Sequence, residues 1–238
     1  MNPSDFAARR DAILARITQA CVASGRDPSE VRLLAASKTR TADDLRAALS
    51  VGQLLYGENR AQELRDKSAA LRGGRPVPEW HFIGPLQRNK VRYVVGTASL
   101  VHAVDSERLA TAISNRAVLL QERAELDGDV GVLIEVNVGG EASKAGVSPE
   151  DALALAAFAD ALPCVSVRGL MCIPPAVDDP EDSAPYFSKM AALAEEGRGR
   201  GLALTELSMG MSGDFEVAVR HGATLVRVGT ALFGPRRR

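Results

Sequence analysis

Short apolar segments alternate with longer amphipathic segments along most of this 238-residue sequence. Near the N-terminus, a cap at Asn2 and Pro3 is followed by apolar residues at helical spacing, which predicts an amphipathic helix; they are Phe6, Ile13, Leu14 and Ile17. After this helix the pattern changes to short apolar runs of the kind that form buried strands. Eight such runs are predicted, at residues 33–37, 54–56, 81–83, 100–103, 132–137, 167–171, 206–208 and 224–228.

Helix start signals lie between several of these runs. They are Thr41 with Asp44, Ser106 with Glu107, Ser148 with Pro149, and Ser212 with Asp214. Regular alternation of strand and helix is typical of a parallel sheet, and eight units predict a single α/β domain over residues 1–238, a (β/α)8 barrel of the TIM type with an extra N-terminal helix. The alternative is an open doubly wound sheet, but its G-x-G-x-x-G fingerprint does not follow the first strand.

Composition and charge narrow the classes of protein further. The formal net charge of -1 argues against nucleic acid or an anionic membrane as a partner, because both select a strongly basic face. The only dense basic run is the tail at 235–238, which we expect to be solvated. No apolar stretch approaches the roughly 20 residues that span a bilayer. The cysteines lack C-x-x-C spacing and the histidines lack ligand spacing, so we expect a cytoplasmic protein without a metal site.

In a barrel, residues just after each strand face the active-site mouth, and Lys38 follows the first strand. An amine held in a partly apolar pocket loses its proton more easily and can attack a carbonyl to form a Schiff base. The alternative is a lysine that simply extends into solvent. Barrel enzymes often hold a phosphate with the loops after strands seven and eight, and glycines occur there at 208–213 and 227–230. Together these features indicate a phosphate-bearing aldehyde such as pyridoxal 5'-phosphate (PLP).

Arg227 is predicted on the eighth strand, beside the first strand of a closed barrel, where it could reach the pyridine nitrogen of PLP bound at Lys38. An arginine keeps its proton, so the ring nitrogen would stay unprotonated and the ring would be a weak electron sink. The alternative is that Arg227 pairs with a carboxylate inside the barrel. His81 is expected to serve packing, Tyr56 to lie near the mouth, and Lys144 to be a solvated loop charge rather than a transfer site for cofactor.

Several motifs in order carry a resemblance to a known family: LAASK at 34–38, YGENRAQE at 56–63, WHFIGPLQRNK at 80–90, GLM at 169–171, LSMGMS at 207–212 and VRVGT at 226–230. On these, the chain resembles the YggS/PROSC family of pyridoxal phosphate homeostasis proteins, whose fold is like the N-terminal barrel of bacterial alanine racemase. The resemblance implies the cofactor-binding residues. They are Lys38 as the Schiff-base lysine, Arg227 at the ring nitrogen, Ser212, Gly229 and Thr230 at the phosphate, and Asn59 and Ser208 in the pocket.

The resemblance also implies a limit on catalysis. The racemases use a second base, a tyrosine supplied through a C-terminal β domain, whereas this sequence ends with its barrel near Phe233. We therefore expect a PLP carrier that serves vitamin B6 homeostasis, with Lys38 as the only possible catalytic residue. The expected partners are PLP and PLP-dependent apoenzymes, and we expect a monomer because the racemase dimer interface uses the second domain. The alternative is an amino-acid racemase or a D-amino-acid-processing enzyme.

Overall fold

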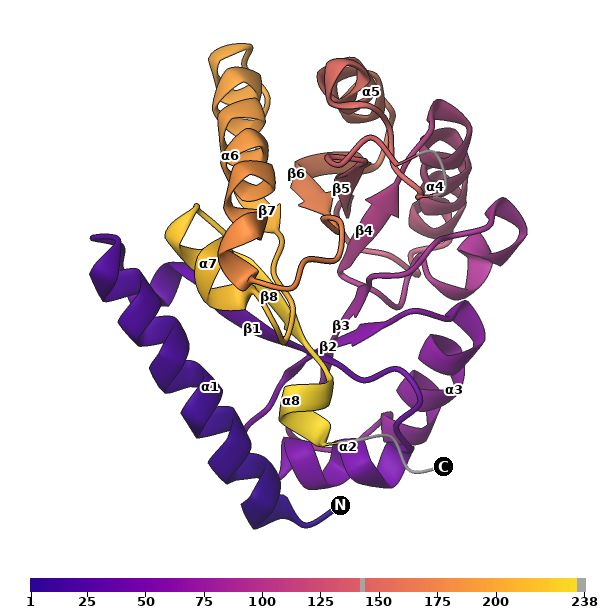
Figure 1. Cartoon of the computed structure of the whole chain (residues 1–238). Helices are drawn as coiled ribbons and strands as arrows, with labels where there is room; N and C mark the ends of the chain where they lie inside the picture. Colours follow the sequence, from indigo (N-terminus) through magenta and orange to yellow (C-terminus); the bar gives the residue numbers. More distant parts are fainter. Residues whose placement is uncertain (142–143, 235–238) are drawn as a thin grey trace.

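Eight parallel strands close into a barrel in a computed structural model of the chain, which describes residues 1–141 and 144–234 (Figure 1). The strands are β1 Arg32–Ala36, β2 Leu55–Glu58, β3 Glu79–Phe82, β4 Leu100–Val104, β5 Val130–Val136, β6 Val165–Cys172, β7 Glu206–Ser208 and β8 Leu225–Val228. Pairing of β1 with β8, with Leu34 opposite Arg227, closes the barrel. The predicted (β/α)8 barrel is therefore confirmed.

Helices surround the barrel (Figure 1). The α-helices are α1 Pro3–Ala23, α2 Ala42–Leu49, α3 Ala61–Leu71, α4 Glu107–Glu122, α5 Pro149–Asp160, α6 Ala184–Gly199, α7 Phe215–Arg220 and α8 Thr230–Phe233. Short 3-10 helices occur at η1 Pro28–Glu30, η2 Arg88–Tyr93 and η3 Pro180–Ser183. Helix η2 stands between β3 and β4, where the other connections carry an α-helix. The additional helix α1 packs along α7 and α8, and Phe6 meets Phe233 with ring centroids 5.2 Å apart.

The Asn2 cap of α1 is confirmed, and so are three of the four helix starts predicted between the strands. Thr41 forms a capping box with Asp44, and the side chains of Ser106 and Ser148 cap α4 and α5. The fourth prediction is wrong, because α7 begins at Phe215 with Asp214 as its cap residue. The Asp214 carboxylate instead accepts a hydrogen bond from the Met211 backbone N–H at 2.6 Å, which closes a turn before the helix.

Two apolar clusters share the core. The larger lies between strands and helices, and the smaller fills the barrel interior with Leu34, Leu55, Leu100, Ala103, Leu133, Met171 and Leu225. Because side chains alternate along a strand, this division fixes which residues face the interior. No helix in the described ranges combines the length and apolar character needed to cross a membrane.

Candidate functional site

Lys38 lies in the turn that follows β1, at the mouth of the barrel. The turn is closed by a hydrogen bond from the Arg40 N–H to the Ser37 carbonyl at 3.0 Å. Thr39 has φ 67°, a left-handed conformation that is unfavourable for a β-branched residue and that often marks a functional site. We expected the Lys38 amine in a partly apolar pocket, and this needs correction, because the side chain is exposed.

A buried lysine of α3, Lys67, stabilises this turn through hydrogen bonds. The Lys67 ammonium donates to the Ser37 carbonyl at 2.9 Å, to Glu58 at 2.7 Å and to Glu63 at 3.1 Å. The Ser37 hydroxyl also donates to Glu58 at 2.6 Å, and the Thr39 N–H donates to Glu63 at 3.1 Å. All three ammonium protons of Lys67 are thereby used. The strained turn is held by a network that the sequence analysis missed.

Arg227 of β8 lies inside the barrel with 5% of its surface exposed. Its Nη1 donates to the Ser208 carbonyl and to the Ser208 hydroxyl, both at 2.6 Å, and its Nη2 donates to the Cys172 carbonyl at 2.8 Å. No carboxylate of the described residues forms an ion pair with it, so the alternative reading of Arg227 is wrong. These bonds use three of five guanidinium N–H donors, which leaves donors for a ring nitrogen.

The loops after β7 and β8 lie side by side. The Arg227 N–H donates to the Gly210 carbonyl at 3.0 Å, and the Ala231 N–H donates to the Ser212 hydroxyl at 3.5 Å. A Cβ at Gly229 would lie 3.3 Å from the Ala36 carbonyl, so glycine lets this loop approach β1 closely. The structure thus brings together the loops that carry the three predicted phosphate ligands: Ser212, Gly229 and Thr230.

Asn59 follows β2, and its buried Oδ1 has no hydrogen-bond partner among the described residues. Buried polar atoms in folded proteins nearly always have a partner, so this orphaned acceptor fits a site that takes a polar ligand. Gly84 packs directly on the Asn59 backbone, because a Cβ there would come within 2.4 Å of the Asn59 carbonyl. The exposed amine, buried guanidinium, glycine loops and orphaned acceptor fit a phosphorylated pyridine aldehyde.

Glu135 of β5 was missed by the sequence analysis. It faces the barrel interior from an otherwise apolar strand, with 7% of its surface exposed. Burial raises the pKa of its carboxyl to about 7; Asp105 adds to the rise and Arg227 opposes it. A single carboxylate inside the run 132–137 was the signal that could have identified it.

Two further expectations need correction. Tyr56 does not lie near the mouth: it is fully buried on the helix side, where its hydroxyl donates to the Gln53 carbonyl at 2.8 Å. Alternation along β2 places Leu55 in the barrel interior and turns Tyr56 away from it. Lys144 is half-buried rather than a solvated charge, because its ammonium pairs with Glu141 at 2.5 Å and donates to the Pro174 carbonyl at 3.1 Å.

His81 is buried inside the barrel, where its ring centroid lies 5.0 Å from that of His102. His221 lies apart from them, at the end of α7, and bonds to Ser188 at 2.9 Å. Across residues 1–141 and 144–234, no three histidine, cysteine, aspartate or glutamate side chains are grouped so that they could hold a metal ion. The basic tail at 235–238 lies outside the described residues.

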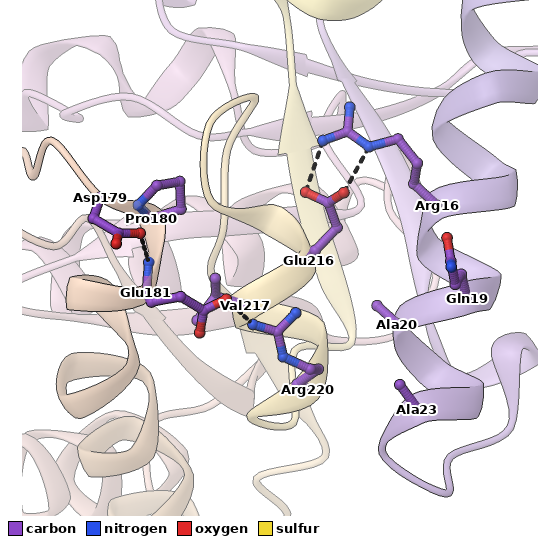
Figure 2. Close-up of a pocket in the computed structure, with 10 residues that line it drawn as sticks. All are labelled: Arg16, Gln19, Ala20, Ala23, Asp179, Pro180, Glu181, Glu216, Val217 and Arg220. Carbon is purple, nitrogen blue, oxygen red and sulfur yellow. Dashed lines mark hydrogen bonds and ion pairs between the residues drawn. The ribbon is translucent and has the colours of Figure 1, made fainter.

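One surface cavity lies on the outside of the barrel, between α1, α7 and η3 (Figure 2). Its charged side chains face one another: Arg16 holds Glu216 with two bonds, of 2.6 Å and 2.7 Å, and Arg220 pairs with Glu181. These charges are satisfied within the cavity, and Lys38 is not among its lining residues. The mouth of the barrel remains the better candidate site.

Comparisons with known proteins concern the family and the fold of the chain. A family model described as alanine racemase, N-terminal domain, matches residues 26–237. The pyridoxal phosphate homeostasis protein of Aquifex aeolicus is 46% identical over 233 residues, which cover 96% of this chain and 97% of that protein. The corresponding protein of Pseudomonas aeruginosa is 44% identical over 224 residues, which cover 94% of this chain and 93% of that protein.

Two solved structures share the fold of this chain. PipY of Synechococcus elongatus PCC7942, solved with PLP bound, is 35% identical with a TM-score of 0.80, over 96% of this chain and 100% of that chain. Alanine racemase of Corynebacterium glutamicum is 17% identical with a TM-score of 0.62, over 93% of this chain and 60% of that chain. The second likeness concerns the fold alone.

Proposed function

This chain belongs to the family of pyridoxal phosphate homeostasis proteins, and from that premise we propose that it binds PLP at the barrel mouth and serves intracellular vitamin B6 homeostasis. It holds the cofactor on Lys38 as a Schiff base and has little or no catalysis of its own. The observation that carries the proposal is the closure of the barrel, which sets the strand before Lys38 directly against the strand of buried Arg227.

Each site residue has a part in this binding. The Lys38 amine would hold the aldehyde carbon of PLP as a Schiff base with loss of one water, and addition of water would release the cofactor again. Ser212, Gly229 and Thr230 hold the phosphate, and Asn59 and Ser208 line the pocket. Bound PLP supplies an aldehyde and an electron-accepting ring. Arg227 donates to the ring nitrogen without giving up its proton, and this keeps the ring a weak electron sink.

Glu135 favours a second candidate function. Its pKa of about 7 suits a general acid or base at neutral pH, and its side chain faces the barrel interior. A group of this kind would support proton transfer in an amino-acid racemase or a D-amino-acid-processing enzyme. The weak electron sink beside Arg227 argues for the carrier instead.

Three further parts of the proposal concern the cell. We place the protein in the cytoplasm, where the thiols of the three free cysteines stay reduced. Its partners besides PLP are PLP-dependent apoenzymes, which receive the cofactor from it. We propose that it acts as a monomer.

The ultraviolet-visible spectrum of purified protein tests the proposal. Wild type should show Schiff-base absorbance with PLP, Lys38→Ala should not, and Lys189→Ala, which removes another exposed lysine, should match wild type. Excess L- or D-alanine with chiral product analysis then separates the two functions. Binding without racemisation supports the carrier, and racemisation at an enzyme-like rate supports the second candidate. If Lys38→Ala keeps both PLP binding and the Schiff-base absorbance, the proposed site is refuted.

A further inference from the structure

A continuous line of hydrogen-bonded side chains crosses the barrel interior from the cofactor arginine to the opposite end. Arg227 Nη1 lies 2.6 Å from Ser208 Oγ, which lies 2.9 Å from His102 Nδ1. His102 Nε2 lies 2.9 Å from His81 Nδ1, and His81 Nε2 lies 3.1 Å from Glu79 Oε1. We call these five residues the interior network. It joins β8 and β7 to β4 and β3, which are not their neighbours in the sheet.

The two ends of the interior network fix the direction of every bond in it. Arg227 can only donate, and the Glu79 carboxylate can only accept. Burial lowers the pKa of His81, and it lowers the pKa of His102 to well below the ordinary value, so burial favours the neutral form of both rings. The hydrogen bond from His81, with help from nearby Arg32, holds the pKa of Glu79 at about 2. Each neutral imidazole has one donor and one acceptor.

Only one arrangement of protons satisfies these conditions. The Ser208 hydroxyl donates to His102 Nδ1, His102 Nε2–H donates to His81 Nδ1, and His81 Nε2–H donates to Glu79. Both histidines are therefore Nε2–H tautomers. The Ser208 proton points away from Arg227, so the lone pairs of its oxygen face the guanidinium. With the opposite tautomer of His102, Ser208 Oγ would accept from both His102 and Arg227, and its own proton would have no acceptor in the interior network.

We propose that His102 and His81 are positioning residues for Arg227, a role that rests on the proposed binding of PLP. They act through Ser208 and do not touch the cofactor themselves. With the Ser208 and Cys172 carbonyls as its other acceptors, Arg227 is held in one plane, and its remaining N–H groups are kept for the ring nitrogen of PLP.

The end of the interior network at Glu79 is anchored separately. Arg32, the first residue of β1, donates to Glu79 Oε2 at 2.5 Å, and the Ser99 hydroxyl donates to Oε1, the oxygen that His81 contacts, at 3.3 Å. Both Glu79 and Arg32 begin their strands, so this anchor lies at the end of the barrel away from Lys38. The Glu79 carboxylate therefore accepts from His81 whether or not PLP is bound. This keeps His81 and His102 in the same tautomers in both states.

The first test observes the histidines in the PLP-free protein. Long-range 15N–1H NMR distinguishes the two neutral tautomers and the charged ring, and His221→Gln removes the remaining histidine signal for assignment. Both buried rings should be neutral Nε2–H tautomers. An Nδ1–H tautomer or a charged ring at His81 or His102 overturns the proposal, and this result does not depend on whether PLP binds.

The second test measures PLP affinity and the absorbance band of the bound cofactor. His102→Leu removes the acceptor for the Ser208 hydroxyl and should raise the Kd by about two- to tenfold with a shifted band, the loss expected for one neutral hydrogen bond. His102→Asn retains an acceptor oxygen and should restore both values, and His221→Gln should match wild type. An equal loss in the Leu and Asn variants would show a packing role and overturn the proposal.

Two outcomes are resolved by further measurements. If His102→Leu does not fold, Ser208→Ala removes one hydroxyl and should give the same shift of the absorbance band, and an unchanged band there overturns the proposal. If wild type itself binds no PLP, the proposed function fails, whereas the tautomers measured in the free protein still decide whether the interior network is as described.

Discussion

Replacement of Glu135 by glutamine should stabilise the PLP-free protein at alkaline pH and leave it almost unchanged in mild acid. The carboxyl is 7% exposed, and burial raises its pKa from 4.5 to about 7 in the folded state. Ionisation is therefore less favourable in the folded protein than in the unfolded chain. The stability that the neutral carboxyl preserves at low pH is lost as the pH rises from the unfolded value through about 7.

The size of the effect follows from the two pKa values. Each pKa unit is worth about 1.4 kcal/mol, so ionising Glu135 should cost about 3 kcal/mol of unfolding free energy once the pH is well above 7. Glutamine has nearly the same shape and no charge to ionise. The variant should therefore gain about 3 kcal/mol over wild type near pH 9 and almost nothing near pH 4.5.

Urea unfolding of the PLP-free protein at several pH values measures this difference directly. Glu122→Gln, an exposed position at the end of α4, controls for the loss of one carboxylate. A gain that is equal at all pH values would show that Glu135 ionises alike in the folded and unfolded states. A loss at alkaline pH would show that the carboxylate has a favourable partner in the folded protein, and the reasoning from burial would be refuted.

Three other substitutions test the framework around the site. Lys67→Met should cost about 3–5 kcal/mol in urea unfolding, because it leaves buried Glu58 without its cation, and a loss below about 1 kcal/mol would show that Glu58 is not charged there. Gly84→Ala should destabilise by about 1–3 kcal/mol and weaken PLP binding in titrations, because the added Cβ displaces Asn59; unchanged binding would exclude Asn59 from the pocket. Thr39→Gly should leave the free energy of unfolding unchanged or raise it by up to about 1 kcal/mol, because φ 67° is strained for threonine but not for glycine. A clear fall in the melting temperature would contradict that strain.

The sequence predicted the barrel because its signals are local. Apolar runs mark the strands, and Thr41, Ser106 and Ser148 mark helix starts through bonds to residues three positions away. Ser212 gave the same signal, but the Asp214 carboxylate instead closes a turn with the Met211 N–H, so the helix starts later. Local patterns cannot show which of two such bonds forms.

The parts of the site that could not be predicted depend on residues far apart in the sequence. The partners of His102 come from β3 and β7, and Lys67 of α3 reaches Ser37 after β1 and Glu58 of β2. No spacing within one segment encodes such contacts. Tyr56 shows a related limit: its strand was placed correctly, but the side to which it points follows from the register of the closed barrel.

The closure of the barrel by its first and last strands has a consequence for synthesis. Lys38 leaves the ribosome well before Arg227 and Gly229, although β1 and β8 are neighbours in the finished barrel. A nascent chain that carries Lys38 but lacks β8 also lacks Arg227 and the loop with Gly229, which we propose hold the ring and the phosphate of PLP. PLP binding at the proposed site therefore requires that translation has passed β8, and a chain truncated before β8 should bind the cofactor more weakly.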